Sequence, residues 1–529
     1  MKSLTQKYNL WLLLGMLALS IYWEYPKILK HPPRGPHIWR QTYTLAFTLA
    51  FYEDNLYPLQ PRNYNMEYAN NTTDHYLIEF PIIPYVNALI WKLTQPNEIT
   101  PRLLTFTLTL IGFVFLRMTL ALFVGELASL ILTLFLWCTP IYGYYSINYL
   151  IDPAAHGLAH IGMYYLVRTL WFGENHWGKV ALWYSIASLI KIMSLYSYLV
   201  LMTGYFLSHL IERRTSELSS RFRMLTWLSI PLLITVLWYY IIRPMYLVQV
   251  DSVSFLFLEL DNVQAKLREV VRFYSKQFFP MPLTYATLLL SIAIPLGNLL
   301  LGGKKVKNAL IYLLINCAAI IAYHIAWFRP DHDYYYTVDY EFLALLWVIG
   351  FKDGYFLSCA PSTTKLTYAI ATIFLVVSAE SVKRNVGMRY GIREYEELDF
   401  FSTKYEVGIF WWHNAEEWDR IYKNFLHVRQ KKLNEKLSIP KDALILCMPD
   451  HTPCGCLYFI QRRGWSDAYG KLGTPELIED KIKRGAQFVF IGNTELVPKE
   501  HPIWRYTRDT LYSEPPLMIM RLGLPAKPS

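Results

Sequence analysis

The sequence predicts a mainly α-helical, polytopic membrane protein with about 11 transmembrane helices and a small extracytoplasmic α/β domain at its C-terminus. Of the 529 residues, 53% are hydrophobic and only 17% are charged, whereas an ordinary soluble domain carries about 25% charged residues. The chain also contains 17 Trp and 41 Tyr, residue types that are enriched at membrane interfaces. Apolar segments recur as far as Val382, and the composition turns polar near Tyr390. We therefore assign residues 1–385 to a multi-span domain and 386–529 to the α/β domain.

The first apolar segment, Tyr8–Tyr22, follows a short stretch that contains Lys2 and Lys7. No small-residue cleavage site follows it, and the sequence Trp23–Pro26 is typical of an interfacial helix end. We interpret it as an uncleaved anchor whose N-terminus lies inside. The later predicted spans are Leu103–Val124, Leu127–Tyr145, Ala154–Phe172, Val180–Leu210, Trp227–Ile242, Leu283–Leu301, Ala309–Phe328, Tyr340–Phe351 and Leu366–Val382.

The segment Val180–Leu210 is interrupted by Lys191, and it is too long for one span. We interpret it as a pair of short helices. With that count, the basic clusters around Arg213–Arg223 and Lys304–Lys307 both face the cytoplasm, as the positive-inside rule requires. The same count places five segments on the outer face: Tyr25–Arg102, Ser146–Pro153, Pro244–Pro282, Arg329–Asp339 and the chain after Lys383. We expect the protein in a bacterial plasma (inner) membrane.

The polar C-terminal part shows four recognisable elements. Ala415–Lys436 has the pattern of an amphipathic helix, and Thr474–Arg484 that of a helix capped by Thr474. Ala443–Cys447 and Phe488–Ile491 are predicted strands. Three cysteines, Cys447, Cys454 and Cys456, lie in this part with too little histidine for a zinc site, so a disulfide and free thiols both remain open.

The net charge of +10 does not indicate a nucleic-acid partner, because cytoplasmic loop bias and sites for anionic lipid or phosphate produce the same excess. The sequence contains neither a P-loop nor a G-x-G-x-x-G motif, so nothing indicates ATP or a dinucleotide. The expected partners are membrane lipids. We expect no nucleic acid.

Several polar residues that a plain helical bundle does not require fall on the predicted outer side. Arg40, Gln41 and Glu79 lie in a first loop of about 80 residues, which is too long for a simple connection. The others are Asp152 directly before Pro153, Lys191 inside the broken helix pair, and His332, Tyr334 and Tyr335 in the last outer loop.

Each of these residues has an ordinary alternative. Asp152 could cap a helix that starts with Pro153. Lys191 could reach the interface or pair with a carboxylate for assembly. The tyrosines could belong to an aromatic belt, and Arg40 could sit among lipid headgroups. Glu79 is harder to explain in this way, because it lies in a run of Phe, Pro and Ile where an unpaired carboxylate is costly.

This set of residue types suits sugar transfer from a polyprenyl-phosphate donor. The acceptor hydroxyl must lose a proton as it attacks the anomeric carbon, and a carboxylate can accept that proton. The leaving lipid phosphate develops negative charge that fixed cations stabilise. Arginine suits this role because its planar fork binds phosphate oxygens in pairs. The hypothesis therefore makes Arg40 and Gln41 ligands of a phosphate–sugar headgroup.

The motifs, in their order, resemble those of the GT-C glycosyltransferases, specifically the bacterial relatives of protein O-mannosyltransferases and aminoarabinose transferases (family 39). The resemblance is carried by "HIWRQTYT", "YLIEFPIIPYVNALIWKL", "PRLLTF", "YYSINYLIDP", "LIKIMSLYS" and "HDYYYTVDY", all between His37 and Tyr340. Each motif is short, and the specificity lies in the order. The tail resembles, more weakly, an extracytoplasmic domain found in many such enzymes.

The resemblance implies a multi-span fold that uses polyprenyl-phosphate sugars, with acidic residues of the outer loops in the active site. It places a Trp-Arg-Gln box on Trp39–Gln41, a Glu-Phe-Pro box on Glu79–Pro81 and a His-x-Tyr-Tyr box on His332–Tyr335. It also implies roles for Asp152 and Lys191. Glu79 and Asp152 become the candidate catalytic carboxylates, and Arg40, Gln41, Lys191, His332, Tyr334 and Tyr335 the candidate donor-binding residues. The implied acceptor is a glycan, lipid or protein. No cofactor is certain, and a divalent metal remains open.

One departure from the family pattern concerns catalysis. Many relatives carry Asp two residues after the Gln, whereas this chain has Tyr43. Either the base role moves to Glu79 or Asp152, or transfer is altered or lost; we expect the first. Glu79 is preferred over Asp152, because an apolar setting raises a carboxyl pKa, whereas a helix start stabilises the ionised form.

Three other classes of protein share some of these sequence features. A flippase- or ligase-type protein of polysaccharide assembly would also be basic and multi-span, but a ligase is expected to carry its long polar loop late in the chain. A transporter would show inverted repeats with broken helices in matching halves, and the sequence shows one broken region. The third class is a non-catalytic scaffold, which the absence of an acid at Tyr43 leaves open.

Overall fold

The computed structural model describes residues 2–54, 57–59, 61–66, 79–212, 222–243, 263–273, 306–327, 332–351, 361–392 and 418–524. The chain forms two compact units. The first comprises Met1–Lys30, Arg102–Ile241 and Asp251–Ile409, and the second His31–Pro101, Ile242–Val250 and Phe410–Ser529.

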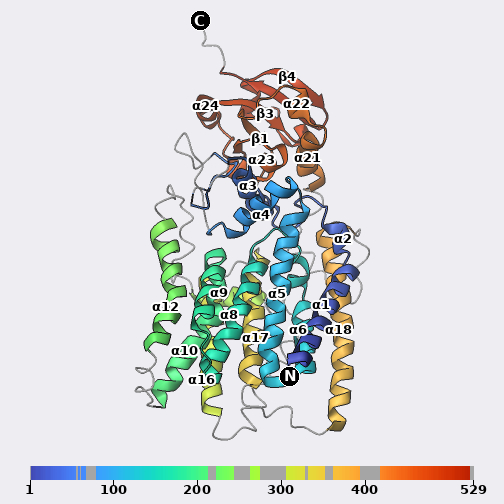
Figure 1. The fold of residues 1–529 in the computed structure, drawn as a ribbon. Coiled ribbons are helices and arrows are strands. Elements are labelled where there is room, and N and C mark those ends of the chain that lie inside the picture. Colours follow the sequence, from blue (N-terminus) through green and yellow to red (C-terminus); the bar gives the residue numbers. More distant parts are fainter. Residues whose placement is uncertain are drawn as a thin grey trace. The chain divides into compact units, whose positions relative to one another are not determined.

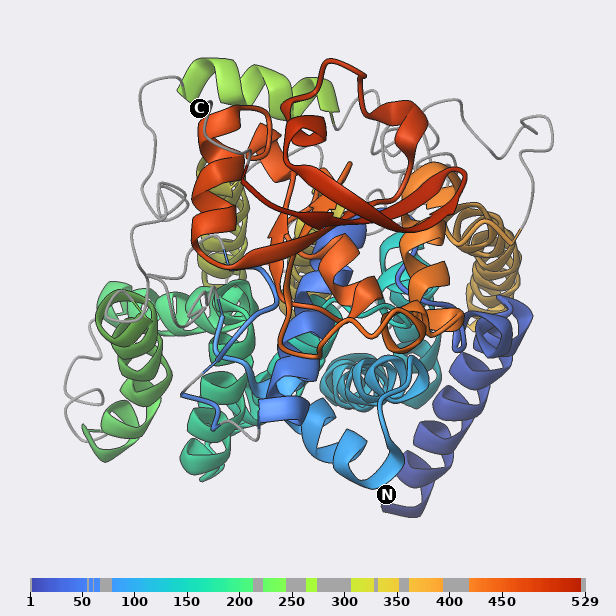
Figure 2. The same ribbon diagram turned by 90° about the horizontal axis from the view of Figure 1, so that it is seen from above.

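The first unit is a bundle of helices (Figure 1). Seen from above, α5 (blue) and α18 (ochre) appear nearly end-on (Figure 2). Its helices are α1 (Lys2–Tyr22), α2 (Tyr25–Ile28), α5 (Ile99–Val124), α6 (Glu126–Trp137), α7 (Pro140–Tyr145), α8 (Asp152–Phe172), α9 (Trp177–Ile190), α10 (Tyr196–Ile211), α12 (Phe222–Val236), α14 (Val263–Phe273), α16 (Val306–Trp327), α17 (Thr337–Phe351) and α18 (Pro361–Arg389). Short 3₁₀ turns are η1 (Ile192–Leu195) and η7 (Asp333–Tyr336), and η2 (Leu237–Ile242) is a π-helix.

Within the described ranges, four helices are long and apolar enough to cross a membrane: Ile99–Val124, Ile192–Ile211, Phe222–Ile242 and Ala309–Ala326. The predicted total of about 11 spans stays a prediction. One predicted span, Leu283–Leu301, lies outside the described residues. The predicted span Leu127–Tyr145 is interrupted, because α6 ends at Trp137 and α7 begins at Pro140. Pro140 can be the first residue of α7 without loss of a hydrogen bond, since the first backbone N–H of a helix has no intrahelical acceptor.

The predicted break in Val180–Leu210 is confirmed. Helix α9 ends at Ile190, Lys191 is extended with φ −153° and ψ 117°, and the chain resumes through η1 into α10. Helix α8 is held against α5 by a close backbone approach, since a Cβ added at Gly112 would lie 2.2 Å from Cα of Gly157. Glycine at these two positions therefore sets the distance between α5 and the helix that begins at Asp152.

The second unit contains a five-stranded sheet with strand order β2-β1-β3-β5-β4. The strands are β1 (Leu444–Met448), β2 (Gly464–Ser466), β3 (Ala486–Ile491), β4 (Thr507–Glu514) and β5 (Leu517–Leu522). Strands β2, β1 and β3 are parallel, and β5 is antiparallel to both β3 and β4. Helices α3 (Ile38–Asp54), α4 (Ile82–Thr94), α21 (Lys423–Gln430), α22 (Leu433–Lys436), α23 (Gly455–Ile460) and α24 (Pro475–Lys483) complete the unit.

The predicted elements of the C-terminal part are largely confirmed. Strands β1 and β3 match the predicted strands, and Thr474 caps α24 by accepting a hydrogen bond from the backbone N–H of Leu477. The predicted continuous helix Ala415–Lys436 is wrong in one respect. From Trp418 on it consists of the π-helix η9 (Trp418–Tyr422), α21 and α22, because Lys432 takes a left-handed conformation with φ 52°.

The segment His31–Pro101 belongs to the same compact unit as the C-terminal segment. The backbone of Tyr64–Met66 runs along the edge of β2, where N–H of Gly464 donates to Tyr64 O at 3.0 Å and N–H of Met66 donates to Gly464 O at 2.7 Å. Arg463 pairs with Asp54 at the end of α3. These contacts cover a sheet edge that would otherwise be exposed. The division at residues 385 and 386 stays a prediction, and this packing adds the first loop to the C-terminal part.

The predicted topology is testable. We expect the N-terminus and Lys305 to face the cytoplasm and the chain after Lys383 to be external, because both basic clusters then lie inside. Reporters that are active on only one side of the membrane, fused after Lys305 and after Ser529, should report opposite compartments. Equal signals from the two fusions would contradict the topology.

Candidate functional site

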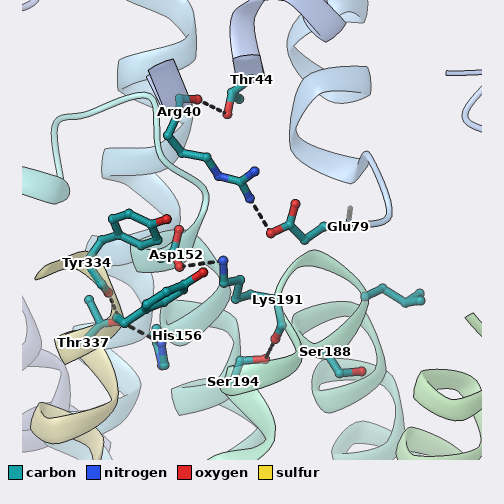
Figure 3. Close-up of polar contacts among 12 residues, drawn as sticks. Arg40, Thr44, Glu79, Asp152, His156, Ser188, Lys191, Ser194, Tyr334 and Thr337 are labelled. Atoms are coloured by element: carbon teal, nitrogen blue, oxygen red, sulfur yellow. Dashed lines mark hydrogen bonds and ion pairs between the residues drawn. The ribbon is translucent and has the colours of Figure 1, made fainter. Parts of the chain in front are cut away.

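Lys191 lies at the break between α9 and η1, so its side chain leaves a helix end rather than a helix face. Its Nζ lies 3.2 Å from Oδ1 of Asp152 (Figure 3), and both residues are buried. A charge buried in such surroundings is stable only when it is paired. The alternative in which Lys191 extends to the interface therefore does not describe the structure, whereas a pair formed for assembly remains open.

Asp152 is the first residue of α8 and is followed by Pro153. The N-cap residue is Ile151, and no side chain caps this helix. The carboxylate thus pairs with Lys191 instead of capping α8, while it still lies where the helix dipole stabilises negative charge. Its second oxygen, Oδ2, has no hydrogen-bond partner among the residues that the structure describes.

The turn η7 presents the predicted His-x-Tyr-Tyr box to Lys191. The ring centroids of Tyr334 and Tyr335 lie 5.6 and 5.2 Å from Lys191 Nζ. The His332 ring stacks on Tyr335 with a centroid distance of 5.7 Å and an interplanar angle of 13°. Five predicted site residues therefore meet in the first unit; we call Asp152, Lys191, His332, Tyr334 and Tyr335 the lysine cluster. Aromatic faces stabilise the lysine charge in a setting that excludes water.

The second unit contains Arg40, on the first turns of α3, and Glu79. The Arg40 guanidinium donates to the Glu79 carboxylate (Figure 3), and both residues are buried, with exposed fractions of 3% and 9%. The guanidinium carbon also lies 5.2 Å from the ring centroid of Tyr43 and 5.9 Å from that of Trp39. Tyr43, which stands where many relatives have an acid, thus serves as an aromatic support for Arg40. We call Arg40, Glu79 and Tyr43 the arginine cluster.

The side chain of Gln41 binds the backbone of the residues that precede α3. Its Nε2 donates to the carbonyl oxygens of Arg34 (2.8 Å) and Pro36 (2.9 Å), and its Oε1 accepts from the Arg34 N–H at 3.3 Å. Both ends of the amide are therefore engaged with the backbone that precedes α3. The predicted contact of Gln41 with a donor headgroup stays a proposal.

The first unit also contains buried polar residues that were not among the predicted site residues. Arg389, the last residue of α18, pairs with Asp333 at 2.8 Å, and Tyr145 donates to the same carboxylate. Arg102, fully buried, donates to the Ile147 carbonyl at 2.7 Å. These groups were detectable as charges next to apolar runs. Three more, His156, His160 and Glu341, lie inside predicted spans, where ionisable residues are rare and usually functional.

The described part of the chain contains neither a cluster of side chains suited to a metal ion nor a disulfide. No group of three or more His, Cys, Asp or Glu side chains there is arranged to hold a metal ion. Cys447, Cys454 and Cys456 are buried thiols that are not in a disulfide. Burial raises the pKa of the Cys447 and Cys456 thiols, which makes both weak nucleophiles.

Comparison with solved structures identifies the class of fold. The mainly helical chain with its C-terminal sheet has the fold of the GT-C glycosyltransferases, as the sequence resemblance implied. The particular matches are two crystal structures of ArnT from Cupriavidus metallidurans. The form bound to undecaprenyl phosphate superimposes with a TM-score of 0.55, and the apo form with 0.54. Each match covers 96% of this chain and 97% of the other, at 11% sequence identity.

No family model and no curated protein sequence matches the chain. At 11% identity the structural likeness establishes the fold and leaves the reaction to be argued from the residues.

Proposed function

We propose that the protein is a membrane glycosyltransferase that transfers a sugar from a polyprenyl-phosphate donor to a glycan, lipid or protein acceptor at the outer face of a bacterial plasma membrane. The observation that carries the proposal is the buried Asp152–Lys191 pair with Tyr334 and Tyr335 beside it. It occurs in a fold shared with a protein that has been crystallised with undecaprenyl phosphate.

The proposed role of Lys191 and Arg40 is to stabilise the phosphate of the donor. Transfer turns a phosphodiester-like donor into a lipid phosphate with more negative charge, and fixed cations in a water-poor setting lower the energy of that change. Both cations already have carboxylate partners in the structure. A phosphate therefore binds by exchanging with, or adding to, an existing partner. His332, Tyr334 and Tyr335 are proposed to surround the sugar or the phosphate with aromatic and polar edges.

The proposed base is Glu79, with Asp152 as the alternative. In the structure the ion pair with Arg40 stabilises the ionised form of Glu79 and makes it a poor proton acceptor. When the donor phosphate takes the Arg40 fork, the carboxylate loses that stabilisation and becomes able to accept the hydroxyl proton of the acceptor. Substrate binding would thus activate the base. Asp152, held by Lys191 and the start of α8, is better suited to orient the acceptor or Lys191.

The direct test is donor consumption by the full-length protein in lipid vesicles. Purified protein is mixed with a radiolabelled polyprenyl-phosphate sugar and a membrane extract that supplies acceptors, and release of free polyprenyl phosphate is measured. We expect release with the native protein and none after Asp152→Asn with Glu79→Gln. Absence of donor binding and of release across several sugars would overturn the proposal and favour a non-catalytic or polysaccharide-assembly protein.

A double substitution separates a role in assembly from a role in transfer. Lys191→Met leaves the Asp152 carboxylate buried without its cation, and breaking a buried pair in this way destabilises a protein by about 3–5 kcal/mol. Lys191→Met combined with Asp152→Asn removes both charges, so stability should return close to the native value. We expect transfer to remain lost in the double variant, as measured by thermal unfolding and donor consumption in parallel.

Lys179 provides the matched control for this experiment. It lies on α9, is exposed, and its Nζ is 4.7 Å from the ring centroid of Tyr165, so it also has a tyrosine partner. Lys179→Met should leave both stability and transfer nearly unchanged. If the Lys191→Met, Asp152→Asn variant regains native transfer together with native stability, the pair serves assembly alone.

A further inference from the structure

One face of α8 is polar along its length inside the apolar bundle. Asp152, His156 and His160 follow one another at intervals of four residues, which places them on the same side of the helix. Glu341 of α17 faces the two histidines, with His156 Nδ1 3.4 Å and His160 Nε2 2.6 Å from its Oε1. All three side chains are at most 2% exposed. The proposed transfer reaction uses none of them.

The atoms around His156 restrict where protons can lie. The Thr337 hydroxyl lies 2.8 Å from the Tyr334 carbonyl oxygen and 3.1 Å from Nε2 of His156 (Figure 3). A hydroxyl has only one hydrogen. When Thr337 donates it to the Tyr334 carbonyl, which is the shorter contact, the hydroxyl oxygen must accept from His156, so Nε2 of His156 carries a proton.

The opposite nitrogen of His156 then needs a second proton. Nδ1 faces Oε1 of Glu341, and two lone pairs facing each other in a buried site would repel. His160 already occupies the same oxygen at 2.6 Å and can do so as a neutral ring that donates from Nε2. Among the described residues, neither oxygen of Glu341 and neither Nδ1 of the two histidines has a hydrogen-bond partner of standard geometry, so the two contacts with Oε1 are ion-pair distances. The arrangement is complete when Glu341 is ionised, His160 is neutral and His156 carries both ring protons.

We propose that His156 and Glu341 bind one proton as a buried imidazolium–carboxylate pair, completed by His160, and that this proton positions the Asp333–Tyr336 turn through Thr337. The pair has no net charge, which suits an apolar bundle. His156, Glu341 and Thr337 are positioning residues, since they are proposed to act on Lys191 through the turn that holds Tyr334 and Tyr335.

Loss of the proton rearranges one hydrogen bond. The neutral His156 keeps hydrogen on Nδ1 for Glu341, and its Nε2 becomes an acceptor. The Thr337 hydroxyl then donates to Nε2 and no longer to the Tyr334 carbonyl. The only bond that breaks is Nε2–H of His156, and its proton leaves for solvent. The first turn of α17 is thereby uncoupled from η7, which carries the aromatic partners of Lys191.

The other titratable groups around Glu341 are neutral or separately paired. Tyr142 of α7, Tyr184 of α9 and Tyr196 of α10 interact electrostatically with it, and tyrosine is uncharged near neutral pH. Asp339 of α17 has its own contact with His324 of α16, at 2.8 Å between Oδ1 and Nε2. On the remaining side, the Phe113 ring packs 5.8 Å from the His160 ring. The two histidines are therefore the groups that contact Glu341 as possible cations, and the Thr337 contact assigns the second ring proton to His156.

The test measures the histidine rings directly and does not depend on the proposed transfer activity. The full chain is labelled with ¹⁵N-histidine, reconstituted in lipid nanodiscs, and followed by nitrogen NMR across pH, with His156→Gln to assign the signals. At pH 7 we expect both nitrogens of His156 to be protonated and one nitrogen of His160. In Glu341→Gln the amide donates to Nδ1 in place of an ionic contact, so His156 should be neutral at the same pH.

Glu174→Gln is the matched control, because Glu174 lies 2.9 Å from Nε2 of His176 in a partly exposed pair. It should leave the His156 signals unchanged. A neutral His156 in the native protein at pH 7, or an imidazolium signal that persists in Glu341→Gln, would overturn the proton assignment whatever the transfer assay shows.

The positioning role is tested by Thr337→Val, which removes the hydroxyl and keeps the shape. Nε2 of His156 then has no acceptor for its proton, so the imidazolium signal at pH 7 should be weaker than in the native protein. If the proposed transfer activity exists, transfer in the native protein should fall as pH rises through the His156 titration. In Thr337→Val transfer should be lower by up to about tenfold and no longer follow that titration. Unchanged activity with the native pH profile in Thr337→Val would overturn the coupling. Intact NMR behaviour without any transfer would overturn the proposed function alone.

Discussion

Glu79→Gln is expected to lower the turnover of sugar transfer by about 10²–10⁴-fold, because general-base catalysis contributes rate accelerations of that order. The amide keeps the shape of the side chain and its oxygen can still accept from Arg40, so the buried contact survives. What is lost is the carboxylate that becomes basic when the donor phosphate takes over the Arg40 fork. Donor affinity should therefore be kept, or improved, since the competing carboxylate charge is gone. Turnover and donor affinity are measured separately in vesicles.

Glu98→Gln is the matched control for this variant. Glu98 is a partly buried glutamate in the same compact unit and, like Glu79, it pairs with an arginine, Arg429. Its replacement should leave turnover close to native. If Glu79→Gln retains turnover while Asp152→Asn abolishes it at unchanged donor affinity, Asp152 is the base and Glu79 only holds Arg40.

The fold was predictable from the sequence because its main signals are local. Apolar runs, the break at Lys191 and the Thr474 cap each depend on a few neighbouring residues, and the structure confirms the break and the cap. The first loop was less predictable. The sequence predicts an outer loop over Tyr25–Arg102, yet Ile38–Asp54 within it is a helix that is largely buried in the second unit. Its burial depends on partners such as Arg463 that are several hundred residues away.

The candidate site shows the same limit. The order of motifs selected Lys191, Asp152 and the tyrosines of η7, and the structure brings them together. The sequence could not show that Asp152 pairs with lysine and caps no helix, because a proline after an acid is typical of both arrangements. It also could not pair Glu341 with His156 and His160, since α8 and α17 are far apart in the chain and only packing aligns their polar faces.

Arg40→Lys is expected to weaken donor binding by about 10–100-fold, although the positive charge remains. Lysine keeps an ionic contact with Glu79 but loses the planar fork that can engage two phosphate oxygens, and hydrogen bonds to charged groups are each worth about 1.5–3 kcal/mol. Lysine also stacks less well than guanidinium on the Tyr43 ring. Donor binding to the purified variant in vesicles measures the loss directly.

The lysine variant is more informative than Arg40→Ala, because alanine would leave Glu79 buried without a cation and destabilise the protein by about 3–5 kcal/mol. Arg429→Lys is the matched control, since Arg429 also combines a glutamate partner with a tyrosine ring, 5.9 Å away at Tyr458. It should lose the same local contacts without changing donor affinity. If Arg40→Lys and Arg429→Lys bind donor equally well, Arg40 does not bind the phosphate. The exchange between Glu79 and phosphate then cannot be how the base is activated, because that exchange requires the Arg40 fork to move from one anion to the other.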